Sequence, residues 1–320
     1  MRDALVAVAV VFAVVAGTND GSSILSAGLR VPGLRPLTSL AVLMAAVLVG
    51  PIVLFGTGVA TTLAHHLVPS SGASADRLVL VAAVSAMTVV FALTRFGLPT
   101  SLTLALIGGI TGAGLGAGLP LSDSTLVTIL VFGAAAPLLC VALGFLAARL
   151  ALRAVGGSQV TRRARRLHGL AFSLQCLAYS ANGGQKMLAI FAVAAGAATG
   201  SAVRDPFWLG VLMALLFGCG ALLGLRRISE SLGKDILAVH LRHALVAESC
   251  SFAVVMGAGL MGLPVTMSQS VTGALIGAGA SESRTRVRWP AATRIAGAWA
   301  VTLPASIALA ALGGGITRLI

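Results

Sequence analysis

Runs of apolar residues long enough to cross a lipid bilayer recur along the whole sequence, for example at residues 36–63, 124–148 and 207–225. A membrane-spanning helix needs about 20 such residues to cross ~30 Å of hydrocarbon, and the runs predict roughly ten spans. Hydrophobic residues make up 58% of the 320 residues and charged residues only 10%, whereas soluble domains carry about 25% charged residues. The sequence therefore predicts an all-α integral membrane protein, because helices satisfy their own backbone hydrogen bonds within lipid.

The formal net charge is +13, and the basic residues gather in short connections between the apolar runs. A nucleic-acid-binding protein spreads such charge over one face, so we expect membrane lipid and no nucleic acid as a partner. The densest cluster extends from Arg149 to Arg166, and short basic loops stay on the cytoplasmic side of a membrane. The same bias places the connections that contain Arg30, Arg226 and Arg284 on the cytoplasmic side. We therefore expect a multi-pass protein of the cell membrane.

The sequence contains an internal repeat. The tripeptide Gly-Leu-Pro at residues 97–99 recurs at residues 262–264, and the match continues without a gap for about fifteen further residues. Hydroxyl side chains recur at matched positions, namely Ser101 with Thr266 and Thr103 with Ser268. A match of this length indicates two related halves.

A shorter match sets Gly-Thr-Asn-Asp at residues 17–20 against Ser-Ala-Asn-Gly at residues 180–183. The predicted organisation is a first transmembrane repeat at 1–148, a basic cytoplasmic loop at 149–168 and a second transmembrane repeat at 169–320. The charge bias of the connections indicates that the two repeats have opposite orientations. Inverted repeats with broken helices are typical of secondary transporters, whose substrate and ion sites lie near the bilayer midplane.

The polar segment of the first half centres on Asp20, which enters the bilayer region with Asn19 and Ser23. A charge at that depth costs ~2.5–3.5 kcal/mol on insertion scales. The cost is tolerated beside a cavity, a cation or a partner charge, and Gly17 and Gly21 allow the helix to open there. We interpret Asp20 as a site for a coupling cation or proton; the alternative is that it ends the first span and caps the next helix.

The polar segment of the second half contains Asn182, Gln185 and Lys186 between two apolar runs. An ammonium at membrane depth suits an anionic substrate or the carboxylate of Asp20. The alternative is that Lys186 reaches from a helix end to the interface.

Both Gly-Leu-Pro segments read as helix breaks followed by hydroxyl side chains. Freed backbone amides at the start of a half-helix favour anions, and a tetrahedral oxyanion needs hydrogen-bond donors from several directions. We therefore expect the matched residues Ser101, Thr103, Thr266 and Ser268 to bind substrate. The alternative for any one of them is packing or hydrogen bonding to its own helix.

Glu248 is a second deep carboxylate, and it is either a coupling site for a cation or the interfacial end of a helix. The sequence shows no nucleophile–base pair and no cluster of metal ligands. We therefore expect no enzymatic activity, no bound metal and no cofactor other than a coupling cation, H⁺ or Na⁺.

These segments resemble the inorganic phosphate transporter (PiT) family, whose halves each contain a Gly-x-Asn-Asp segment and a Pro-Val-Ser-Thr-Thr-His segment. Residues 17–20 are similar to the first Asn-Asp motif, and Asn182 with Gln185 and Lys186 to the second. Pro99 and Pro264 open the two later motifs, and the ending at residues 298–304 is also similar.

The resemblance implies a cation-coupled transporter with re-entrant hairpins that bind phosphate between them, often as a homodimer. Glu248 is similar to a family glutamate that precedes the second hairpin. The sequence departs from the family pattern at Gly183, which replaces an acidic residue, and at Leu104 and Gln269, which replace histidines. One carboxylate fewer favours proton coupling or a neutral metal–phosphate complex over coupling to several sodium ions.

The predicted function is therefore symport of inorganic phosphate with protons or sodium, or transport of a metal–phosphate complex. Two alternatives remain at this point: a permease of the same fold for sulfate or another oxyanion, and a membrane protein that binds an anion without transporting it.

Overall fold

The computed structural model describes residues 2–31, 33–51, 56, 58–63, 67, 73–95, 100–154, 162–195, 206–235 and 239–319, and these residues form no β-strand. The elements in chain order are α1 (Arg2–Ala16), a π-helical segment (Gly17–Gly21), α2 (Ser22–Leu29), α3 (Pro36–Val49), α4 (Gly58–Thr61), α5 (Ala73–Arg95), α6 (Leu102–Ala117), α7 (Asp123–Ala154), α8 (Arg162–Tyr179), a second π-helical segment (Ser180–Gly184), α9 (Gln185–Ala194), α10 (Pro206–Asp235), α11 (Leu241–Leu260), α12 (Met267–Glu282), a 3₁₀ turn (Arg284–Arg286) and α13 (Trp289–Leu319).

Six helices of the described residues are long and apolar enough to cross a membrane: Arg2–Leu29, Ser74–Arg95, Asp123–Leu150, Phe207–Leu225, Leu241–Leu260 and Trp289–Arg318. The outer faces of these helices expose large apolar side chains such as Phe91, Leu138 and Trp208. A surface of this kind is stable against lipid and unstable against water. The prediction of an all-α membrane fold is confirmed.

Some boundaries differ from the prediction. The apolar run at 36–63 is not one span, because α3 ends at Val49 and the chain leaves α geometry at Gly50 and Pro51. Proline lacks the backbone N–H that a continuing α-helix needs. The segment predicted as a basic loop at 149–168 is largely helical, since α7 continues to Ala154 and α8 begins at Arg162. Arginine is a good helix former whose long side chain reaches water from a helix end.

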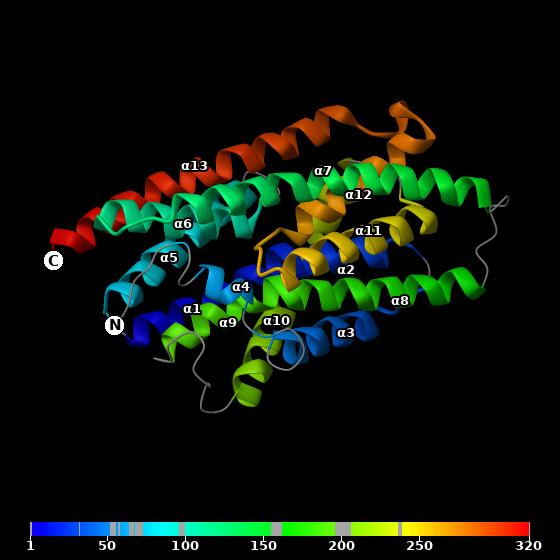
Figure 1. Cartoon of the computed structure of the whole chain (residues 1–320). Helices are drawn as coiled ribbons and strands as arrows, with labels where there is room; N and C mark the ends of the chain where they lie inside the picture. Colours follow the sequence, from blue (N-terminus) through cyan, green and yellow to red (C-terminus); the bar gives the residue numbers. More distant parts are fainter. Residues whose placement is uncertain are drawn as a thin grey trace.

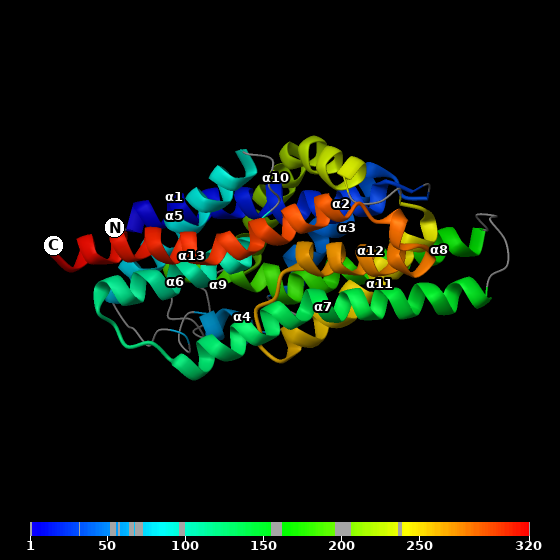
Figure 2. The same ribbon diagram turned by 90° about the horizontal axis from the view of Figure 1, so that it is seen from above.

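The two halves are related by inversion. Helices α6 and α12 both begin at the centre of the molecule, and α6 runs toward the end that carries both termini while α12 runs toward the opposite end (Figure 1). Helices α1 and α8, which open the two halves, also run in opposite directions (Figures 1 and 2). The end reached by α12 contains the basic starts of α8 and α11, so the charge bias predicts that this end is cytoplasmic.

The two halves exchange packing partners. The long helix α7 of the first half packs along α12 of the second, and α13 of the second half packs along α6 of the first. Glycines form both interfaces, so that a Cβ added to any of them would collide with a backbone carbonyl of the partner helix. The pairs are Gly108 with Leu303, Gly112 with Ile307, Gly273 with Pro137 and Gly277 with Val141. Small residues allow such close backbone approach, which drives helix association inside membranes.

Replacing Gly112 by alanine is expected to destabilise the protein, because the new methyl group would collide with the carbonyl of Ile307. Overpacking of this kind costs about 1–3 kcal/mol. The matched control is Gly297→Ala on α13, where a Cβ would meet no atom within 4 Å. Thermal unfolding in detergent, monitored by size-exclusion chromatography, is expected to give a lower midpoint for Gly112→Ala than for the control. Equal midpoints would contradict the close packing of α6 on α13.

Candidate substrate and ion site

Two membrane helices change to π geometry at matched positions, Gly17–Gly21 in the first half and Ser180–Gly184 in the second. A π turn is often found at a functional site because it displaces side chains from the regular helical pattern. The first helix was expected to open at Gly17 and Gly21. It is distorted more mildly than that, since the flanking residues keep right-handed helical dihedral angles. Gly17 is needed for packing: a Cβ there would collide with the carbonyl of Phe217 on α10.

Asp20 lies inside the protein, with 4% of its surface exposed. The Asn19 side chain donates a hydrogen bond from Nδ2 to Asp20 Oδ1 (2.9 Å), and Ser23 Oγ donates to the Asn19 carbonyl oxygen (2.6 Å). Helix α2 has no side-chain cap at its start. Asp20 therefore neither caps the next helix nor lies at the headgroups, in contrast to the alternative interpretation.

The second π segment holds the chain that leads into α12. Asn182 Nδ2 donates to the Leu263 carbonyl oxygen (2.8 Å), and Asn182 Oδ1 accepts from the backbone N–H of Val265 (3.1 Å). Gln185 acts elsewhere, since its Oε1 accepts from the N–H of Val59 (2.7 Å) at the start of α4. Asn182 thus positions the second hairpin, and Gln185 anchors a connection of the first half.

Lys186 joins three parts of the molecule. Its Nζ donates to Thr103 Oγ1 on α6 (2.7 Å) and to the Val265 carbonyl oxygen before α12 (2.8 Å). Only 5% of its surface is exposed, so it does not reach to an interface. The ammonium charge is close enough to attract the carboxylate of Asp20, and the two charges keep the centre of the protein near neutrality.

The starts of α6 and α12 meet at the centre of the molecule. Ser101 and Thr266 are their N-cap residues, and the hydroxyl oxygens of these two side chains are 2.7 Å apart. Ser101 Oγ also accepts from the N–H of Leu104 (3.1 Å), as an N-cap side chain does. Two helix N-termini that face each other create a region of positive potential for an anion.

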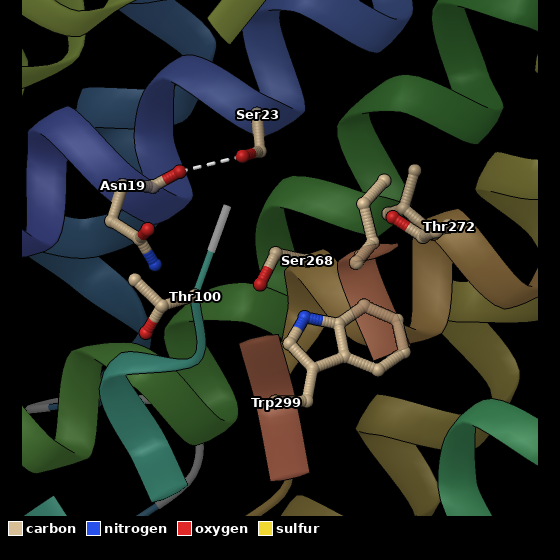
Figure 3. Close-up of a pocket in the computed structure, with 8 residues that line it drawn as sticks. Asn19, Ser23, Thr100, Ser268, Thr272 and Trp299 are labelled. Carbon is tan, nitrogen blue, oxygen red and sulfur yellow. Dashed lines mark hydrogen bonds between the residues drawn. The ribbon is translucent and has the colours of Figure 1, made fainter. Parts of the chain in front are cut away.

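A small cavity lies beside this contact (Figure 3), lined by Asn19, Ser23, Thr100, Ser268, Val271, Thr272, Ile295 and Trp299. Its polar lining comes from both halves, and Ser268 Oγ is buried with no hydrogen-bond partner among the described residues. The cavity has a volume of ≈ 10 Å³, which is about the space that one water molecule needs. The cavity is therefore large enough for water or a small cation and too small for phosphate.

Most of the predicted site residues lie together, and two lie apart. Nine of them belong to the two π segments, to the first turns of α2 and α9 that follow these segments, and to the starts of α6 and α12: Asn19, Asp20, Ser23, Ser101, Thr103, Asn182, Lys186, Thr266 and Ser268. Gln185 binds the backbone of Val59. Glu248 pairs with His168, as described below, rather than with the residues of the cavity. The Gly-Leu-Pro segment at residues 97–99, including Pro99, lies outside the described residues.

Sequence reasoning missed two residues, His168 and Tyr179, and it noted the Thr100 hydroxyl without including it in the predicted site. Thr100 lines the cavity and accepts a hydrogen bond from Thr302 Oγ1 (3.3 Å). His168 lies in the segment predicted as a loop, so its burial was not expected. Tyr179 immediately precedes the second π segment, and its ring occupies the space next to Gly183. Tyr179 is the only tyrosine of the chain, and its place among apolar residues was the available signal.

Comparison with known proteins assigns this architecture. The sequence matches the family described as "Phosphate transporter family" in two stretches, residues 16–172 and 153–310. It is 30% identical to the "Probable low-affinity inorganic phosphate transporter" of Rhizobium meliloti (strain 1021), over 96% of this chain and 94% of that protein. It is 26% identical to the protein of the same description from Bacillus subtilis (strain 168), over 99% of this chain and 97% of that protein.

A solved structure has the same fold. The chain superposes on "The sodium-dependent phosphate transporter" with a TM-score of 0.81, over 100% of this chain and 99% of the other, at 16% sequence identity. The shared architecture extends over both inverted halves, because the superposition leaves no part of either chain unmatched beyond a few residues.

Proposed function

Because the chain belongs to the phosphate transporter family, we propose that it is a secondary transporter that carries inorganic phosphate across the cell membrane together with a cation. The observation that carries the proposal is the meeting of two helix starts at Ser101 and Thr266, with the buried ammonium of Lys186 beside them. A transporter family of this kind is not a family of enzymes.

The hydroxyl groups at the two helix starts suit phosphate chemically. Phosphate presents oxygens in a tetrahedral arrangement, and Ser101, Thr103 and Thr266 approach the centre from both halves. Ser101 and Thr266 now hydrogen-bond to each other, and Thr103 Oγ1 accepts a hydrogen bond from Lys186 Nζ. We expect an entering phosphate to replace the Ser101–Thr266 hydrogen bond, so that the two helix starts move apart as the anion binds.

The cavity next to the helix starts suits the coupling cation. Its polar lining is neutral oxygen and amide groups from Asn19, Ser23, Thr100 and Ser268, and Asp20 supplies a negative charge nearby. Hard cations such as Na⁺ prefer oxygen ligands, whereas a proton would bind to the carboxylate of Asp20 itself. Coupling is required energetically, because each net negative charge moved inward against 100 mV costs ~2.3 kcal/mol.

Uptake of radiolabelled phosphate into proteoliposomes tests this function, with sodium and proton gradients imposed separately. We expect Asp20→Asn and Ser101→Ala each to reduce uptake at least about 100-fold, in line with losses seen when a positioned polar group is removed. Thr128→Ala is the matched control, since Thr128 is an exposed threonine on α7 that bonds only its own helix. Undiminished uptake by both variants would overturn the assignment of the site, and equal competition by sulfate would favour a general oxyanion permease.

A further inference from the structure

We propose that His168 and Glu248 form a proton-binding site, separate from the central cavity, that carries a proton coupled to phosphate movement. The inference rests on the proposed function, since it adds a coupled proton, held outside the cavity, to the cation that the cavity suits. The pair joins α8 to α11: His168 Nε2 lies 3.0 Å from Glu248 Oε1, and the two side chains are 0% and 1% exposed.

Each partner retains an unused polar atom. His168 Nδ1 and Glu248 Oε2 are both buried and have no hydrogen-bond partner among the described residues. A buried polar atom without a partner costs about 1–3 kcal/mol. A structural ion pair would be expected to satisfy these atoms, whereas a site that gains and loses protons needs an atom free to receive one.

The charge of the pair depends on one proton. With a single proton between Nε2 and Oε1, the imidazole is neutral and the carboxylate is ionised, so the pair carries one negative charge. A second proton, on Glu248 Oε2 or on His168 Nδ1, makes the pair neutral overall. A net charge is costly in an apolar interior. The pair therefore retains the second proton while it is dry and releases it when water reaches it.

Among the described residues, no further charged side chain forms an ion pair with His168 or Glu248. The elements α2 and α3, which also pack against α8, contain no titratable residue. The second π segment contains none either. Cys176 on α8 faces Glu248, and the other nearby thiols are Cys140 on α7 and Cys250 on α11. Arg165, whose side chain lies near His168 at Gly33, is exposed to solvent.

A neighbouring carboxylate shows how this protein neutralises an acid by other means. Glu282, at the end of α12, contacts Arg242 (2.6 Å), His243 (2.7 Å) and Arg286 (3.2 Å). Arg30, at the end of α2, donates to Ser26 Oγ (3.4 Å). Glu248 has only a histidine as its charged partner, so its charge can be cancelled reversibly by a proton.

Buried polar side chains lie on both sides of the pair, toward the centre and toward one end of the molecule. Toward the centre, Gln175 Nε2 donates to Ser251 Oγ (2.8 Å), and Ser251 Oγ donates to the Glu248 carbonyl oxygen (3.2 Å). Further along α8 lies the second π segment with Asn182. Toward the basic end, His243 follows on α11. The geometry points to release of the proton at the end that the charge bias predicts to be cytoplasmic.

A proton fits this site better than a metal ion. The described residues contain no group of three or more His, Cys, Asp or Glu side chains that could hold a metal. One proton moved with one phosphate monoanion transfers no net charge, which removes the electrical cost of importing the anion.

Two assays in proteoliposomes test the proposal. The first measures phosphate accumulation driven by a proton gradient, and the second measures exchange of external for internal phosphate without a gradient. One coupled proton gives at most about tenfold accumulation per pH unit. We expect Glu248→Gln, which resembles the protonated state, to retain exchange and to lose gradient-driven accumulation. His168→Gln is expected to shift the pH dependence of exchange, and the exposed-acid control Asp123→Asn to behave as wild type.

The outcomes separate this inference from the proposed function. Absence of phosphate exchange in the wild-type protein would reject the proposed function itself. Exchange together with undiminished accumulation by Glu248→Gln would reject only the His168–Glu248 site. Proton entry on addition of phosphate, followed with a pH-sensitive dye in wild-type liposomes, needs no variant and so remains informative if Glu248→Gln fails to fold. No proton entry, with uptake driven by sodium alone, would overturn the inference.

Discussion

Lys186→Met is expected to reduce phosphate uptake at least about 100-fold. Methionine has nearly the length of lysine and is apolar, so the change removes the charge and preserves most of the packing. Thr103 Oγ1 and the Val265 carbonyl oxygen would lose their shared donor. The carboxylate of Asp20 would lose the cation that attracts it.

The loss of charge has two separable consequences. An anion entering between the helix starts would no longer meet a buried positive charge, so binding and uptake would both fall. Breaking a buried charge interaction by removing one partner also destabilises proteins by about 3–5 kcal/mol. We expect Asp20→Asn combined with Lys186→Met to regain part of this stability, because no unbalanced charge remains, and to stay inactive in uptake.

The matched control is Lys234→Met on α10, the same change at the only other lysine of the chain. Uptake measures transport, and the midpoint of thermal unfolding measures stability. Near-normal uptake by Lys186→Met, with the control unchanged, would contradict a role for the ammonium in binding the anion. A double variant no more stable than Lys186→Met alone would contradict its interaction with Asp20.

The internal repeat predicted the centre of the molecule well. The matched positions Ser101 and Thr266 become the N-caps of α6 and α12, and their side chains touch. The matched segments around Asn19 and Asn182 become the two π segments. Repeated segments in an inverted fold are related by a pseudo-two-fold axis, so residues near the axis from both halves must meet. The composition likewise predicted the membrane fold, because lipid permits few architectures.

Pairings between positions that the repeat does not match could not be predicted in the same way. His168 and Glu248 are 80 residues apart, and no match between the halves relates them. The basic residues before His168 indicated a solvated loop, whereas α8 continues through them as a helix. Periodicity identifies an apolar face on a helix, but the partner of a buried polar side chain depends on tertiary packing. The hydrogen bond from the backbone N–H of Val59 to Gln185 Oε1 was missed for the same reason.

Gly183→Asp is expected to lower the midpoint of thermal unfolding strongly, although aspartate is the residue that the resemblance to the transporter family would place there. A Cβ at this position would collide with the ring of Tyr179. That ring is fully buried and stacks on Phe217, with 5.0 Å between ring centroids, so it has no room to move away. Overpacking alone costs about 1–3 kcal/mol, and a second buried carboxylate near Asp20 adds electrostatic repulsion.

Gly183 and Tyr179 therefore act as a compensating pair, in which an aromatic ring fills the volume that an acidic side chain would take. Combining Gly183→Asp with Tyr179→Ala is expected to raise the unfolding midpoint above that of Gly183→Asp alone. The control is Gly169→Asp on α8, where the nearest atom to a new Cβ is Leu34 Cδ2 at 3.9 Å, an ordinary van der Waals contact. A Gly183→Asp protein as stable as this control would show that Tyr179 does not exclude the carboxylate.

The double variant also tests how the charge of the site selects its cation. With Tyr179→Ala and Gly183→Asp together, the centre would hold two carboxylates against the single ammonium of Lys186, one negative charge more than the natural protein. That charge has to be balanced by a bound cation before phosphate can enter. We therefore expect phosphate uptake by the double variant to depend more steeply on external sodium than uptake by the wild type. An unchanged sodium dependence in a folded, active double variant would separate the coupling ion from the number of buried carboxylates.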